Sequence, residues 1–163
     1  MFLTVNQPRF PLRVNVGFLI NQPIGTSRDI HFDFPNLDLS PDLVLSMVHG
    51  LERISRTPQG LLVQADFKAN LQCECVRCLA EFEQPLHTLF SELFAFKTRG
   101  MSESGLLVPE DGNIYLAPLL REYLLLEIPI RPLCTPDCKG LCVDCGVNLN
   151  LATCEHQARV IIE

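Results

Sequence analysis

Eight cysteines constrain this chain more than any other feature of its sequence. They form an early and a late group on either side of residues 79–133: Cys73, Cys75 and Cys78, then Cys134, Cys138, Cys142, Cys145 and Cys154. The stretch 1–11 lacks the basic start and continuous apolar run of a secretory signal, so we expect a reducing compartment. Structural disulfides do not persist there, and this cysteine count therefore indicates metal or redox chemistry.

The composition is that of one folded domain. Of the 163 residues, 47% are apolar and 20% are charged, which is enough apolar material for a buried core. No apolar run approaches the roughly 20 residues that cross a bilayer, so we expect no membrane partner and a cytoplasmic location. The net charge is −6 and no segment is basic, which disfavours a dominant electrostatic grip on nucleic-acid phosphates.

Alternating apolar and polar residues predict several β-strands in the first part of the chain. The alternation is visible at 12–20 and again at 30–34. It is longest at 61–75, where one face is apolar and the other polar. Such a pattern is typical of an antiparallel sheet that has one buried and one solvated side.

A tight turn is expected to connect two of these strands. Thr57-Pro58-Gln59-Gly60 has the composition of a β-turn, so residues 43–56 are predicted to pair with 61–75 as a hairpin. Gly50 is expected to mark a bulge in the first arm. Residues 81–96 are interpreted as a returning strand.

One main helix is predicted after a loop at 97–113 that is rich in glycine, serine and proline. Apolar residues follow helical spacing over 116–128. Pro118 suits an early helix position, and Pro129 ends the helix. Because this helix is apolar on more than one side, we expect it to dock deeply.

These elements predict an α+β fold, an antiparallel β-sheet with one main helix packed on it and a C-terminal zinc-ribbon-like segment. Residues 1–133 are assigned to the sheet domain. Residues 134–163 are assigned to a zinc-bound ribbon packed on that domain, within a single structural unit. The ribbon has few large apolar residues, so it cannot build a core alone and needs a metal to hold it.

The cysteine spacing predicts two closed zinc sites. Two Cys-x-x-Cys pairs each let both thiolates reach one ion from a tight turn. A site that closes a short loop of chain costs less entropy than one that closes a long loop. Cys154 and His156 are therefore assigned to the second Cys-x-x-Cys pair, and Cys134 and Cys138 to the first. The predicted ligands of the first ion are Cys75, Cys78, Cys134 and Cys138, and those of the second are Cys142, Cys145, Cys154 and His156.

Several alternatives remain open at this stage. Cys75 and Cys78 could instead join Cys142 and Cys145, and iron would satisfy the same spacings as zinc. Cys73 is left over and is interpreted as a buried free thiol. Catalytic zinc is disfavoured because enough ligands exist to close both sites, whereas a thiol redox switch is a further alternative.

The motifs resemble those of the YceD family. The run Cys75-Val76-Arg77-Cys78-Leu79 after a long strand is similar to that family's C-x-R-C-L signature. The helical stretch 116–133 looks like its L-x-L-x-x-P ending. Residues 138–150 resemble the ending of its cysteine-rich members, which often carry a second cysteine where this chain has His156. The resemblance extends from about residue 10 to residue 156.

The resemblance implies a non-enzymatic factor that supports accumulation or maturation of large-subunit ribosomal RNA and ribosome assembly. The expected partner is that RNA or a preribosomal particle, or a basic ribosomal protein. The alternative is a zinc-stabilised adaptor for a ribosomal protein or an rRNA-processing enzyme. A candidate contact face comprises Arg77, Arg131, Lys139, Asn148 and Asn150.

Overall fold

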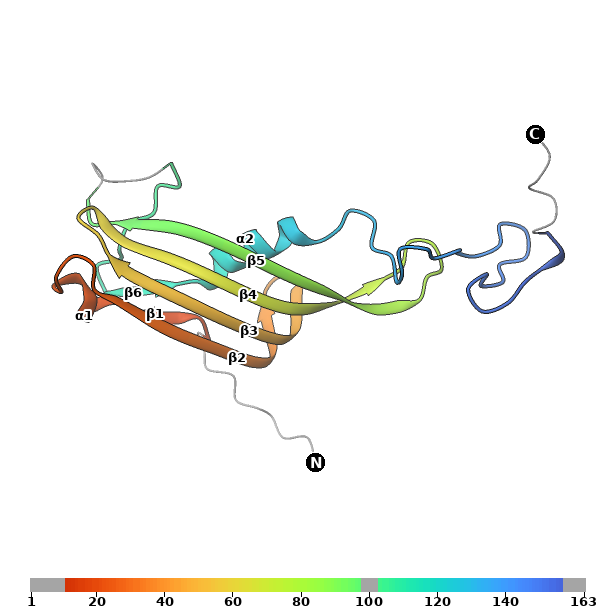
Figure 1. Ribbon diagram of the computed structural model, residues 1–163, viewed down its shortest axis with the longest axis horizontal. Coiled ribbons are helices and arrows are strands. Elements are labelled where there is room, and N and C mark those ends of the chain that lie inside the picture. The colour runs from red at the N-terminus through yellow and green to blue at the C-terminus, as the bar shows by residue number, and fades with distance from the viewer. Residues whose placement is uncertain (1–10, 98–102, 157–163) are drawn as a thin grey trace, which may run out of the picture.

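The computed structural model describes residues 11–97 and 103–156 and confirms the α+β class. Four long strands form one antiparallel sheet in the order β2-β3-β4-β5 (Figure 1). Their bounds are Ser27–Leu39 for β2, Leu43–Arg56 for β3, Gly60–Glu74 for β4 and Glu81–Ala95 for β5. The remaining elements are β1 (Arg13–Asn15), α1 (Gly17–Ile20), β6 (Asn113–Tyr115) and α2 (Ala117–Glu127).

The predicted hairpin and the predicted helix are both confirmed. Strand β3 pairs with β4 across the turn, where the Thr57 N–H donates to the Gly60 carbonyl oxygen at 2.9 Å. The Thr57 hydroxyl accepts a hydrogen bond from the Gly60 N–H at 3.1 Å, so side chain and backbone close the turn together. Helix α2 lies within one residue of its expected bounds at each end.

Proline marks the two edges of the large sheet. Strand β2 contains Pro35 and strand β5 contains Pro85, while the central strands contain none. Proline has no N–H to donate to a ladder, so it is tolerated where one side of the strand is unpaired. The sequence therefore carries a signal for strand order as well as for strand position.

The core lies on one face of the sheet. Helix α2 buries Leu120 and Leu124 there, and the small β1–β6 sheet adds Val14 and Ile114. In Figure 1, α2 runs along the face of the large sheet, close to β5. The opposite face stays solvated, as the alternating pattern predicts. None of the helices in the described ranges is long and apolar enough to cross a membrane.

Three predictions about local structure are wrong, and the first two concern β1 and α2. The strand expected over 12–20 is limited to β1, because the chain turns into the short helix α1 at Gly17. The Asn15 side chain accepts a hydrogen bond from the Gly17 N–H at 3.3 Å and favours this turn. Helix α2 also docks less deeply than expected, since Leu126 is 80% exposed.

Gly50 is not a bulge. The register of β3 against β4 shifts between Ser46 and His49, whereas Gly50 is regularly paired with Phe67. A Cβ atom at position 50 would lie 2.2 Å from Cε1 of Phe67. The glycine therefore makes room for a fully buried aromatic ring, which also stacks on Phe32 at a centroid distance of 5.7 Å.

Glu52 is an ionisable group inside the core. Its side chain is fully buried on β3, in a cross-strand row with Ile30 and Ala65. Neither carboxylate oxygen has a hydrogen-bond partner in the described part of the chain. Burial raises the pKa of Glu52 to about 7, so the folded protein holds a proton there that the unfolded chain loses near pH 4.5.

We predict that Gly50→Ala destabilises the fold by about 1–3 kcal/mol, because the new methyl group forces the Phe67 ring out of its position. Chemical denaturation measures the change. In a Phe67→Leu background the same substitution should cost clearly less, since the obstructing ring is gone. Gly17→Ala is the matched control, because its nearest neighbour would be Asn15 Oδ1 at 3.6 Å. An equal cost in both backgrounds would contradict the packing role of Gly50.

We also predict a stability difference between native protein and Glu52→Gln that depends on pH. Below about pH 4.5 the Glu52 carboxyl group is protonated in both the folded and the unfolded state, so its ionisation does not change the free energy of unfolding. As pH rises towards 7 the unfolded state releases the proton first, so native stability falls, by about 3 kcal/mol in total. The glutamine variant should lack this fall. Denaturant unfolding of both proteins at several pH values measures it, with the exposed Glu83→Gln as control. A difference that is constant from pH 4 to 8 would overturn the assignment.

Candidate metal centre

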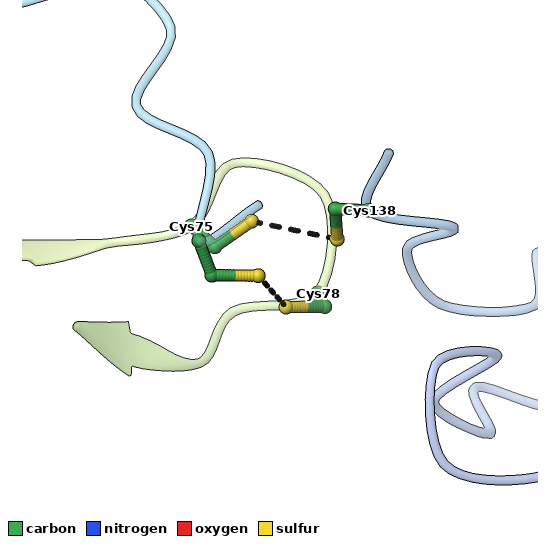
Figure 2. A group of neighbouring side chains, drawn as sticks. Cys75, Cys78 and Cys138 are labelled. Carbon is green, nitrogen blue, oxygen red and sulfur yellow. Dashed lines mark hydrogen bonds between the residues drawn. The ribbon is translucent and has the colours of Figure 1, made fainter. Parts of the chain in front are cut away.

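The first cysteine group joins the end of the β4–β5 hairpin to the segment that follows α2. Cys75 and Cys78 lie in the hairpin connection, and Cys134 and Cys138 lie beyond the helix. The four sulfur atoms all lie within 4.8 Å of one another, and three of the four residues are buried. Figure 2 shows Cys75, Cys78 and Cys138 directed towards a common centre.

The sulfur distances fit a tetrahedral ion. Sγ of Cys75 lies 3.7 Å from Sγ of Cys138, and Sγ of Cys78 lies 3.6 Å from Sγ of Cys134. Metal–sulfur bonds of about 2.3 Å in a tetrahedron place neighbouring sulfur atoms about 3.8 Å apart. A disulfide requires about 2.05 Å, and none of the eight cysteines forms one. This group can therefore hold one tetrahedral metal ion.

The backbone around the first pair forms a tight knuckle. The Leu79 N–H donates to the Cys75 carbonyl oxygen at 2.9 Å, and the Cys75 N–H donates to that of Ala80 at 2.9 Å. Leu79 adopts a positive φ of 59° to close the turn. The Val76 N–H donates to the Pro132 carbonyl oxygen at 3.0 Å. This bond holds the segment that carries Cys134 and Cys138 beside the knuckle.

A small apolar cluster shields the first group. Phe82, Leu133 and Leu141 pack against the buried cysteines. Cys75 would have a raised pKa from burial alone, but backbone N–H groups of Cys134, Cys78 and Arg77 donate to its sulfur and lower the pKa to about 6. Thiolate is the form that binds metal, so these N–H donors favour the metal-binding form of Cys75.

The second cysteine group is local and repeats the same knuckle. Its four ligand atoms, from Cys142, Cys145, Cys154 and His156, all lie within 4.8 Å of one another. The Gly146 N–H donates to the Cys142 carbonyl oxygen at 2.9 Å. Gly146 has a φ of 73°, so it occupies the position that Leu79 holds in the first knuckle.

Two observations suit the second group to a metal ion. Backbone N–H groups of Cys145 and Asp144 donate to the sulfur of Cys142 and lower its pKa to about 7. Nδ1 of His156 is buried and has no hydrogen-bond partner among the described residues. A buried, unpaired imidazole nitrogen costs free energy, which a coordinated cation would remove. This group is less buried than the first, and Cys145 is exposed.

The eight predicted ligands are thus brought together as two sets of four, in the sequential grouping. The swapped alternative, with Cys75 and Cys78 beside Cys142 and Cys145, is not the arrangement observed. Cys73 lies outside both sets and is half-buried opposite Phe82 of β5, where desolvation raises its pKa.

Two residues of the expected contact face have a different role. The Arg77 side chain donates to the carbonyl oxygen of Cys138 at 2.8 Å, and the Asn150 amide donates to its sulfur at 3.3 Å. Both side chains therefore support the first group directly. Only their proximity to cysteines in the sequence hinted at this, because the contacts depend on how the knuckles fold together. Arg131 and Lys139 are exposed, as a contact face requires.

A comparison with protein families finds one match over most of the chain. The family model described as "Large ribosomal RNA subunit accumulation protein YceD" matches residues 63–161. This range includes most of strand β4, strand β5, helix α2 and both cysteine groups. No solved structure matches the chain.

Several curated proteins are similar to this chain. An uncharacterized protein of Mycobacterium tuberculosis is 29% identical over 153 residues, which cover 90% of this chain and 70% of that protein. An uncharacterized protein of Mycobacterium leprae is 32% identical over 103 residues, covering 60% and 46% of the two chains. The chloroplastic "Large ribosomal RNA subunit accumulation protein YCED homolog 1" of Zea mays is 45% identical over 40 residues, covering 24% and 14%.

Proposed function

This chain belongs to the YceD family, and we propose that it is a non-enzymatic factor supporting accumulation of large-subunit ribosomal RNA, with two zinc ions as scaffold. The family description and the names of the plant relatives support the process. The cysteine groups support the scaffold: each supplies four ligands, so neither leaves an open position for a reacting water molecule.

Zinc is favoured over other metals by the donors themselves. Seven thiols and one imidazole form the two sets, and soft thiolates in a tetrahedron suit zinc or an iron–sulfur centre. The histidine in the second set favours zinc there, since thiolate and imidazole are its common structural ligands. Bound zinc would hold residues 134–156 against the β4–β5 hairpin end as part of one structural unit.

A second candidate function is an adaptor for a basic ribosomal protein or an rRNA-processing enzyme. Two zinc sites with seven thiolates in total would take the net charge from −6 to roughly −9, which favours a cationic protein over RNA. The metal-bearing end of the molecule also exposes apolar side chains. Ile130 and Val143 are each 98% exposed, and Leu151 is 85% exposed. Exposed apolar residues of this kind suit a protein contact.

A thiol redox switch is supported less well. Such a switch needs accessible thiolates, yet Cys75, Cys78 and Cys138 are buried. Cys145 is the exposed thiol of the two groups, so oxidation would begin in the second.

We predict two zinc ions per chain in protein purified without added metal. Cys78→Ser should lose one ion, because it removes a ligand of the first set, and Cys145→Ser should lose the other. Elemental analysis with a parallel thiol titration measures both. Cys73→Ser is the matched control and should retain both ions. Fewer than two ions in the native chain, or paired disulfides, would refute the two-site scaffold.

We predict that cells lacking this protein contain less large-subunit ribosomal RNA relative to small-subunit RNA. The Cys73→Ser chain should restore the ratio, whereas Cys78→Ser should not, because its first site is incomplete. Quantitative RNA measurement in the deletion strain tests this. An unchanged ratio in that strain would contradict the proposed process.

Gradient sedimentation then separates the two candidate functions. The tagged native protein should travel with large-subunit precursors, and raising the salt concentration should release it. If the association survives nuclease treatment and a basic protein remains bound, the adaptor function holds. If nuclease abolishes the association, the protein contacts RNA directly.

A further inference from the structure

The second cysteine group lies on a segment that projects away from the sheet. In Figure 1 the chain from residue 141 to 156, shown in blue, extends beyond the hairpin end of β4 and β5. The described hydrogen bonds that tie this segment to the first group pass through a short seam formed by Arg77, residues 138–141 and residues 148–150.

The backbone of the seam is closely fitted. The Leu141 N–H donates to the Arg77 carbonyl oxygen at 3.0 Å, and the Leu149 N–H donates to that of Gly140 at 2.9 Å. Gly140 has a φ of 76°, and a Cβ atom there would lie 3.0 Å from the Arg77 carbonyl oxygen. The knuckle of the first group and the segment that carries the second group therefore meet at Gly140, a position that only glycine fits well.

Asn150 connects the two cysteine groups. It lies between Cys145 and Cys154, which belong to the second set, yet its Nδ2 donates to the sulfur of Cys138 in the first set at 3.3 Å. Its Oδ1 accepts a hydrogen bond from the Lys139 N–H at 2.8 Å. Its Nδ2 and backbone N–H both donate to Oδ1 of Asn148, at 2.9 and 3.0 Å. The amide is thus held by Asn148 of its own loop and by Lys139 beside Cys138 of the first group.

We propose that Asn150 couples the two metal sites, so that closing the second site strengthens metal binding at the first. An N–H donor to a ligating thiolate stabilises its negative charge, and such outer-shell partners typically change metal affinity by about 10–100-fold. The donor is in place only when residues 145–154 are folded, and those residues are too polar to fold without their ion. The second ion therefore positions a donor for the first.

Coupling of this kind is reciprocal. If the second ion raises the affinity of the first site, the first ion raises that of the second by the same factor. The more exposed second site is expected to lose its ion first, and its loss then weakens the first site. This inference rests on metal occupancy of both sites, which is part of the proposed function.

The test uses Asn150→Asp in the full chain. Aspartate keeps the oxygen that accepts from Lys139 but replaces the donor to Cys138 with an anionic oxygen. Asn148→Asp is the matched control: it adds the same charge in the same loop and keeps its acceptor role towards Asn150.

Cobalt(II) is the probe, because its absorption distinguishes a site of four thiolates from one of three thiolates and an imidazole. Asn150→Asp should weaken cobalt binding at the first site about tenfold or more, and Asn148→Asp should leave it nearly unchanged.

A double-mutant cycle tests the coupling itself. Removing the second site with Cys145→Ala and Cys154→Ala should weaken cobalt binding at the first site in the native background, by a factor similar to that of Asn150→Asp. In the Asn150→Asp background the same removal should have little further effect. Equal effects of the two aspartate variants, or losses that multiply independently, would overturn the proposal. If the native chain binds no cobalt, the metal scaffold fails; if it binds two ions without coupling, only this inference fails.

Discussion

The C-terminal segment depends on closing the first cysteine group. Residues 134–156 contain few large apolar side chains, so burial of apolar surface cannot offset the entropy of ordering them. Four sulfur atoms converging from the hairpin end and from the segment after α2 supply the missing interaction once an ion is bound. A cation also reverses the electrostatics of the site, because four adjacent thiolates repel one another without it.

The sheet and the helix place these ligands. Strands β4 and β5 pair over their full length, from Gly60 with Ala95 to Glu74 with Glu81, so the knuckle of Cys75 and Cys78 is held at the end of a long ladder. Helix α2 packs its buried leucines on the same sheet and ends at Glu127, which directs the chain back towards that knuckle. A core on one face thus determines where two distant cysteine pairs meet.

Local patterns in the sequence were sufficient to predict the hairpin, the main helix and the tight turns at the two Cys-x-x-Cys pairs, because each is specified by neighbouring residues. Elements that depend on distant residues were not predictable in this way. The alternation at 12–20 indicated the strand that became β1, but no local pattern indicates that Val14 pairs with Ile114 of β6. The roles of Gly50 and Glu52 follow from what faces them across the sheet, so neither could be read from its own surroundings in the sequence.

The two knuckles have the same backbone turn in different surroundings. Each closes with an N–H four residues after the first cysteine, donated by Leu79 in one and Gly146 in the other. Leu79 accepts an unfavourable positive φ where neighbouring segments fix the turn on both sides, whereas Gly146 occupies an open turn with no atom near its missing Cβ. The first site is therefore supported by the surrounding fold, and the second relies on its own loop. A projecting segment of this kind is suited to contact a partner, provided that the seam at Arg77 and Asn150 keeps it in a fixed orientation.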